Sequence, residues 1–331
     1  MKIIYKIGLI LVVFIVVVIV CGLLYINLAF PKVSPAPKMK INATPELLAR
    51  GEYLVKHVAL CLDCHSERDW NYYSGPIKEG TFGKGGEVFD EGEGIPGKIY
   101  AKNITPAALA SWTDGELYRA ITAGVDNKGE PLFPLMPYEN FGTMDPEDLN
   151  AIIAYIRTLK PIPNNVPVHS LDFPMNLIVR TIPQNGTPTK RPPETDTIAY
   201  GRYMVNAASC AACHTPMEKG NPVPGMDFAG GFEFKTPVGT FRPANITPDN
   251  ETGIGLWTED AFIQRFKTYE KPESMKIKTK LGDFNTFMPV TQYAGMTVAD
   301  LKAIYKYLRT VKPVHNKVNK FTPPETKTAG M

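Results

Sequence analysis

Cysteine and histidine recur at one fixed spacing in two short runs, residues 61–65 (CLDCH) and 210–214 (CAACH). Two thiols three positions apart at the start of a helix can bond the two vinyl groups of one porphyrin, and the histidine that follows then faces its iron. The sequence therefore predicts two covalently bound haem c groups. They would be attached through Cys61, Cys64, Cys210 and Cys213, with His65 and His214 as proximal iron ligands.

Other uses of paired cysteines fit less well. A structural zinc site favours cysteine pairs some 15–20 residues apart, whereas 145 residues separate Cys64 from Cys210. A thioredoxin-like redox pair needs an alternating strand–helix pattern, which is missing here. Plain disulfides remain an alternative for an exported chain. We favour haem because both matches occupy equivalent places in an internal repeat.

Methionine is the expected distal ligand. Met136 and Met288 occupy matching positions, 71 and 74 residues after His65 and His214, and each precedes a proline. A thioether is a soft, neutral ligand that favours reduced iron. The alternative is that these methionines only fill the core.

His57, His169 and His315 are not repeated, so we interpret them as packing or surface histidines. Iron with six ligands has no open site, which favours electron transfer over catalysis.

The body of the chain repeats itself once. Beyond the cysteine motifs, matching segments recur at offsets of 142–152 residues: RGEYLV (50–55) with YGRYMV (200–205), NITP (103–106 and 245–248), and YIRTLKP (155–161) with YLRTVKP (307–313). A period of this size indicates one domain used twice rather than a solenoid.

The elements that must position these residues are mainly helical. In the first copy we expect a helix from Pro45 to about Ala59, capped by Thr44, and a closing helix that Asp145 caps. Short helices should begin near Thr113 and Thr258, and the second closing helix should open with Thr297 and Asp300 as a capping-box-like pair. No alternating strand pattern is evident.

The amino-terminal 30 residues differ from the body. Residues 7–30 carry no charge and would form a helix of about 36 Å, long enough to span a membrane. A cleaved signal peptide is the alternative, although its apolar part is normally shorter. We interpret Cys21 as an apolar residue of this span. An extended stalk (31–44), a proline-rich connector (161–196) and a flexible polar tail (314–331) complete the expected organisation.

Composition sets the limits of this interpretation. The chain has 331 residues, is 44% hydrophobic and 21% charged, and carries a formal charge of +3. This is a globular composition with room for two domains. The near-neutral charge excludes the basic field of a nucleic-acid-binding protein, so we expect no nucleic-acid partner.

Each copy resembles a class I cytochrome c domain, with Gly51 and Tyr155, or Gly201 and Tyr307, where the first and last helices cross. The chain is similar to the multihaem cytochrome c subunits of membrane-bound periplasmic dehydrogenases of the alcohol, gluconate and sorbitol type. This similarity is carried by the two NITP segments and by GIGLWTEDAF (253–262), PLFPLMPYENF (131–141) and LDFPMN (171–176). Those subunits commonly carry three haems and a carboxy-terminal anchor, whereas this chain has two motifs and an amino-terminal apolar run.

The resemblance implies a mainly α fold. Two tandem class I cytochrome c domains, 45–160 and 197–313, would follow a single transmembrane helix within residues 1–30. It also implies that Asn103, Asn245, Trp112 and Trp257 lie near the haem edges and bond propionates; the alternative is a buried tryptophan at a helix start. Arg119 and Arg265 would pair with propionates or lie on solvated faces.

The function expected from these features is electron transfer, not catalysis. A dihaem cytochrome c in the cytoplasmic membrane, single-pass with its body in the periplasm, would carry single electrons between a periplasmic donor, expected to be a dehydrogenase, and the respiratory chain. Haem c is attached on the outer side of the energised membrane, which sets this orientation. The alternatives are a subunit of a quinol-oxidising or terminal oxidase complex, a dihaem peroxidase and a haem-bearing sensor.

Overall fold

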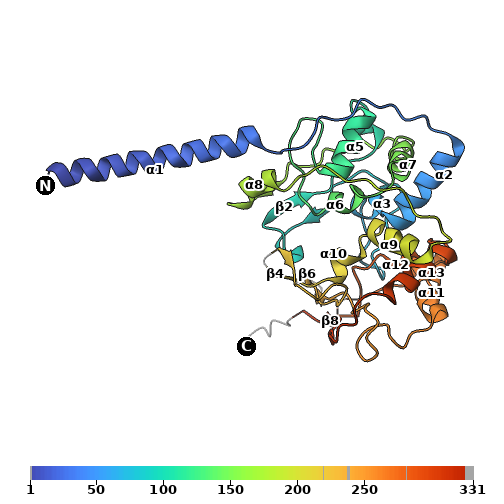
Figure 1. Cartoon of the computed structure of the whole chain (residues 1–331). Coiled ribbons are helices and arrows are strands. Elements are labelled where there is room, and N and C mark those ends of the chain that lie inside the picture. Colours follow the sequence, from blue (N-terminus) through green and yellow to red (C-terminus); the bar gives the residue numbers. More distant parts are fainter. Residues whose placement is uncertain (1, 219, 237–238, 281, 325–331) are drawn as a thin grey trace.

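The computed structural model describes residues 2–218, 220–236, 239–280 and 282–324. A long helix, α1 (Lys2–Ala29), projects from a body made by the rest of the described chain (Figure 1). It contains the expected apolar run and extends it toward the amino terminus. Its residues are apolar enough to cross a membrane, and the most apolar stretch is not buried by the body. A membrane anchor and a signal sequence share these properties.

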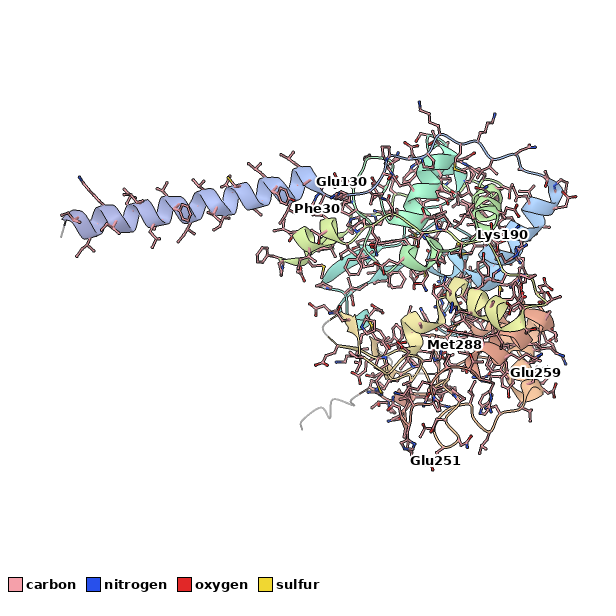
Figure 2. All side chains as sticks on the ribbon, in the orientation of Figure 1. Phe30, Glu130, Lys190, Glu251, Glu259 and Met288 are labelled. Carbon is pink, nitrogen blue, oxygen red and sulfur yellow. The ribbon has the colours of Figure 1, made fainter. Side chains whose placement is uncertain are left out.

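The base of α1 is tied to the body. Arg180 donates a hydrogen bond to the carbonyl of Phe30 and forms a 2.8 Å ion pair with Glu130. Figure 2 shows Phe30 and Glu130 close together where α1 meets the body. The expected stalk is extended, but it lies on the body, since the backbone N–H of Ser34 donates to the side chain of Asn185.

A first helical unit follows the stalk. Its helical elements are α2 (Pro45–Tyr53), η1 (Leu54–Val58), α3 (Cys61–Cys64), η2 (Glu91–Glu93), α4 (Pro106–Leu109), α5 (Asp114–Ala123), α6 (Tyr138–Phe141) and α7 (Pro146–Ile156). Thr44 caps α2 and Asp145 caps α7, as expected. The first helix continues through the π-helical segment η1, so its end near Ala59 is also confirmed. The helix expected near Thr113 is α5, with a full capping box.

A second helical unit has five α-helices in the same order as α2, α3, α5, α6 and α7. Its elements are α9 (Thr197–Ala207), α10 (Cys210–His214), α11 (Glu259–Lys267), η4 (Pro272–Lys276), α12 (Val290–Tyr293) and α13 (Val298–Leu308). Thr258 and Thr297 cap α11 and α13, as expected. The other half of the expected capping box is not formed. The carboxylate of Asp300 instead accepts hydrogen bonds from the hydroxyls of Tyr53 and Tyr200.

The first and last helices of each unit cross at a glycine. A Cβ added at Gly51 would lie 2.0 Å from the carbonyl oxygen of Ala151, and one at Gly201 would lie 2.0 Å from that of Ala303. No side chain fits at either point, so the backbones of α2 and α7, and of α9 and α13, approach as closely as they do only because glycine is present.

Short strands occur where no strand was expected. Within the described residues they form three small antiparallel sheets, β1 (Val88–Phe89) with β2 (Gly97–Tyr100) and β3 (Ser170–Leu171), β4 (Met217–Glu218) with β5 (Asn221–Pro222), and β6 (Phe234–Thr236) with β7 (Gly239–Phe241) and β8 (Phe321–Thr322). Each is two to four residues long. Runs this short are below the length at which alternation can be recognised.

The connector and the tail pack along the body. The connector contributes β3, α8 (Met175–Ile178) and η3 (Val179–Thr181). The prediction of a flexible tail from residue 314 is wrong for its first part. Asn316 donates to the carbonyl of Ala229, and β8 pairs with β7, where Phe321 contacts Phe241. Phe321 supplies the apolar area that holds this segment. Residues 325–331 lie outside the described part of the chain.

The two units share one interface with reciprocal contacts. Tyr53 of the first unit donates to Asp300 of the second, and Tyr203 of the second donates to Asp148 of the first at 2.6 Å. In each case the same tyrosine oxygen also accepts a backbone N–H from the residue that caps the opposite closing helix. Buried residues of both units belong to one continuous apolar core. The units are therefore parts of a single packed body.

Candidate haem-binding sites

Both cysteine motifs lie on short helices that begin in the same unusual way. The residues before the first cysteines, Leu60 and Ser209, have φ values of 51° and 52°. This left-handed conformation costs about 1 kcal/mol or more for a residue with a Cβ. The chain accepts that cost at the same place twice, which shows that both units turn their motif in the same way.

The two motif histidines are held alike. Nδ1 of His65 lies 2.6 Å from the carbonyl oxygen of Lys102, and Nδ1 of His214 lies 2.7 Å from that of Ala244. A carbonyl oxygen only accepts, so Nδ1 carries the proton and Nε2 keeps its free lone pair. Desolvation lowers the pKa of both rings, and the hydrogen bond only partly opposes it. Both imidazoles are thus neutral near pH 7, the form that ligates a metal.

All four motif cysteines are free thiols. Desolvation raises the pKa of Cys61 and Cys64 to about 12 each, that of Cys210 to about 12, and that of Cys213 to about 11. Cys64 and Cys213 are nevertheless exposed. Water therefore reaches the second thiol of each motif, although enough protein atoms lie near it to raise its pKa.

The matched methionines precede the helices α6 and α12. Met136 and Met288 are half-buried and pack against the common core. The carbonyl of each accepts the N–H two residues on, from Tyr138 at 2.7 Å and from Val290 at 2.8 Å. Figure 2 shows Met288 well inside the outline of the body. The two turns therefore have the same local geometry; their role as distal ligands stays a prediction.

The two asparagines of the NITP segments hold turns. The side-chain oxygen of Asn103 accepts from the backbone and hydroxyl of Thr105, and its amide donates to Ile162. Asn245 makes the same contacts with Thr247 and with Val314. Both side chains thus tie the turn to the chain just beyond the closing helix. Bonds to propionates stay a prediction for these residues.

The remaining expected residues have varied surroundings. Trp112 packs partly against the core, whereas Trp257 is 38% exposed and lines a surface pocket beside Arg265. Arg119 donates to the carbonyl of Asp126, and Arg265 donates to the hydroxyl of Tyr269. Their predicted propionate contacts are untested.

Three histidines lie outside the motifs. His57 packs between the two units, and His169 and His315 lie on or near the surface. Nδ1 of His57 lies 2.8 Å from the carbonyl of Gln292 in the other unit. His169 is half-buried, and His315 is exposed near Asp249. These positions are in keeping with packing or surface roles.

The two motifs lie close to each other across the interface. Desolvation raises the pKa of Cys64, and a thiolate at Cys213 would raise it further. Desolvation likewise raises the pKa of Tyr293, and negative charge at cysteines of either motif would add to this effect. The hydroxyl of Tyr293 donates a 2.9 Å hydrogen bond to the carbonyl of Ala208, two residues before Cys210. Tyr293 therefore lies near both motifs, and no pattern in the sequence around it bears on that position.

A buried polar cluster also joins the motifs and was missed. Asp63, inside the first motif, forms a 3.1 Å ion pair with Arg68 and accepts a 3.0 Å hydrogen bond from Gln292 of the second unit. Desolvation raises the pKa of Asp63, and Arg68 only partly offsets it. The sequence did contain a signal for this cluster. Asp63 is a charged residue inside the first motif, at the position where the second motif has Ala212.

Comparison with known proteins identifies the class. Residues 198–312 match the cytochrome c family, so the second unit is a cytochrome c domain. Haem c is the prosthetic group that this family implies.

Individual proteins that are similar to this chain give more detail than the family match does. The chain is 28% identical to the cytochrome c subunit of a quinone-type alcohol dehydrogenase from Gluconacetobacter polyoxogenes, over 82% of this chain and 58% of that protein. It is 25% identical to the gluconate 2-dehydrogenase cytochrome c subunit of Pantoea cypripedii, over 82% and 60%. A diheme cytochrome c of Cereibacter sphaeroides is 26% identical over 63% and 72%. The chain is thus distantly homologous to dehydrogenase cytochrome subunits and spans less than two thirds of their length.

The residues at both motifs fit a covalently bound haem. The thiols are unpaired, Nδ1 of each motif histidine is bound to a backbone carbonyl so that Nε2 keeps its lone pair, and the second cysteine of each motif is exposed. Next to Met136, the buried hydroxyl of Tyr138 has no hydrogen-bond partner in the described structure. An unpartnered buried donor is costly, and a bound group with oxygen or sulfur acceptors would relieve it.

Proposed function

We propose that this chain is a membrane-anchored dihaem cytochrome c that carries single electrons between a periplasmic dehydrogenase and the respiratory chain. The observation that carries this proposal is the duplicated motif, with each histidine turned by the same backbone hydrogen bond. A bound haem c supplies one-electron redox chemistry at each motif.

We propose the first unit as a second cytochrome c domain. It has the same glycine crossing at Gly51, the same left-handed residue before its motif, and the same asparagine turn at Asn103. The resulting organisation is an anchor (1–30), a stalk (31–44), domain 1 (45–160), a connector (161–196) and domain 2 (197–313).

The site residues have distinct proposed roles. The cysteines would hold the macrocycles covalently, and His65 and His214 would ligate iron through the free Nε2. Met136 and Met288 would provide the distal ligand. Ligation from both sides leaves no position for peroxide or oxygen, which supports a carrier rather than a peroxidase.

The location follows from the proposed chemistry. With α1 as an uncleaved anchor, haem attachment outside the cytoplasmic membrane places the body in the periplasm. Homology to dehydrogenase cytochrome subunits supports a dehydrogenase as electron donor. Gentle solubilisation followed by copurification tests the partner. A recovered dehydrogenase is expected, and recovery of a quinol-oxidising or terminal oxidase complex instead would contradict it.

Haem content and ligation are tested on the purified chain. The expected result is two haems per chain, both low-spin. Met136→His and Met288→His should each lower the potential of one haem, because imidazole stabilises oxidised iron more than a thioether does. Redox titration followed by absorbance measures both potentials. An unchanged potential in both variants would reject the methionine ligands, and a single haem would reject the dihaem assignment.

A further inference from the structure

Each unit contains a longer loop that its counterpart lacks. In the first unit Gly85 follows His65 by 20 residues, whereas in the second unit the equivalent Gly230 follows His214 by 16. Both paths end in the same way, with the glycine N–H donating to the histidine carbonyl. From Thr258, which caps α11, to Met288 the second unit spans 30 positions, against 23 from Thr113, which caps α5, to Met136. The extra residues therefore lie after the motif in one unit and before the methionine in the other.

The two longer loops meet. Tyr72 pairs with Lys278 in an antiparallel bridge, and the N–H of Tyr73 donates to the carbonyl of Ile277 at 2.8 Å. The ring of Trp70 lies 4.8 Å from that of Phe287, centre to centre. We call residues 69–75 the Ser74 loop. It belongs to the first unit but lies against the segment that leads to Met288 of the second.

Ser74 makes the central contacts of this meeting. Its hydroxyl donates to the carbonyl of Met288 at 2.7 Å and accepts the N–H of Val290 at 3.1 Å. Its own N–H donates to the buried side chain of Asn285 at 2.8 Å. One fully buried serine thus binds both sides of the Met288–Pro289 turn.

The surroundings of Ser74 hold it rigidly. Its φ is 64°, a left-handed conformation that persists for a residue with a Cβ only where neighbouring contacts enforce it. Arg68 supplies such contacts, donating to the carbonyls of Ser74 and Gly75 while paired with Asp63. Ser74 is therefore fixed to the first attachment motif on one side and to the Met288 turn on the other.

The first unit's methionine has no equivalent support. Within the described part of the chain, no side chain of the second unit hydrogen-bonds to residues 135–137. The nearest inter-unit bonds join Asn206 to Asn140, within α6, and to Thr143, beyond it. The two distal turns thus share their local geometry but differ in what holds them.

We propose that Ser74 of the first unit is a positioning residue that holds Met288 in place as the distal ligand of the second haem. The proposal rests on the function proposed above. Its consequence is that Met288 dissociates from iron less readily than it would without Ser74, while Met136 is indifferent to that residue. The second haem then resists small ligands that compete for iron. This resistance is greater than the second unit alone would provide.

The test uses the full-length, haem-loaded protein in detergent, with imidazole as the competing ligand. In a Met136→His background only the second haem keeps a methionine to displace. Adding Ser74→Ala there should increase the imidazole affinity of ferric protein about tenfold, since each lost neutral hydrogen bond is worth roughly a factor of 2 to 13. Ser74→Gly removes the same hydroxyl while suiting the positive φ, so it checks the result if the alanine variant folds poorly.

The mirror background provides the matched control. With Met288→His only the first haem keeps a methionine, and Ser74→Ala should leave its imidazole affinity within twofold. Tyr53→Phe removes another inter-unit hydrogen bond, one made to Asp300 rather than to the Met288 turn, and should leave imidazole affinity unchanged. An unchanged affinity in the Met136→His background, or an equal rise in both backgrounds, would overturn the proposal. If neither single histidine variant alters its haem, the failure lies with the ligand assignment itself.

Discussion

Single residues do the work of joining the two units. Asp148 illustrates this, because its carboxylate is almost fully buried and binds Arg50, Arg191 and the hydroxyl of Tyr203 together. Burial alone would raise its pKa, but the hydrogen bonds and charges of these partners outweigh it and hold the pKa below its ordinary value. The paired carboxylate therefore stabilises the folded state wherever it is ionised.

This linkage gives a pH prediction. The unfolded carboxyl titrates near pH 3.9, whereas the folded one stays ionised to lower pH, so its contribution is full above about pH 4 and is lost as pH falls further. Asp148→Asn should destabilise the protein by about 2 kcal/mol at pH 7, with a smaller difference at pH 3. Urea unfolding at both pH values measures this. Asp172→Asn, at an exposed position, is the control. If the difference in unfolding free energy between Asp148→Asn and the unsubstituted protein were as large at pH 3 as at pH 7, the linkage would be contradicted.

Local residue patterns were predictable and distant pairings were not. Thr44, Asp145 and Thr297 cap helices as expected, because a cap depends only on residues within one turn. The reciprocal tyrosine–aspartate bonds join residues that are 55 and 247 positions apart, and no local rule selects those partners. The repeat did align Tyr53 with Tyr203, in RGEYLV and YGRYMV, and Asp148 with Asp300 in the closing helices, and this double match was a signal in the sequence.

Among the elements, the crossings of the first and last helices contribute most to holding each unit together. At Gly51 and Gly201 the facing helix presents its backbone carbonyl, which cannot rotate away as a side chain would. These crossings were anticipated from the glycine and aromatic pair in each copy. The short strands, the left-handed turn before each motif and the packed tail were not, since each depends on tertiary contacts rather than on local preference.

The crossing yields an element-scale prediction. Gly51→Ala should destabilise the protein by about 3 kcal/mol, because the new methyl would overlap the carbonyl of Ala151 and push α2 from α7. Thermal unfolding of the haem-loaded protein measures the loss. Gly22→Ala in α1 is the control, since a Cβ there meets nothing within 4 Å. Equal stability of the two variants would show that the crossing tolerates a side chain.

At the scale of the whole molecule, the two units behave as one. They share one apolar core, reciprocal hydrogen bonds, the Asp63–Gln292 bond and the Ser74 contacts. Neither unit can lose its structure without exposing core and buried polar groups of the other.

The expected consequence is a single cooperative unfolding transition. Calorimetry of the haem-loaded chain in detergent should give one endotherm whose calorimetric enthalpy equals the van't Hoff enthalpy. Two resolved transitions, each accompanied by spectral loss of one haem, would show that the units are energetically separate.

The reciprocal tyrosine–aspartate contact has an implication for ancestry. Each half carries both a donor and its complementary acceptor, the arrangement that two identical subunits form across a two-fold axis. An ancestral chain of one such half would have been self-complementary. The present molecule then corresponds to a homodimer fused head to tail, and its inequivalent loops, among them the one bearing Ser74, are the asymmetry that fusion permits.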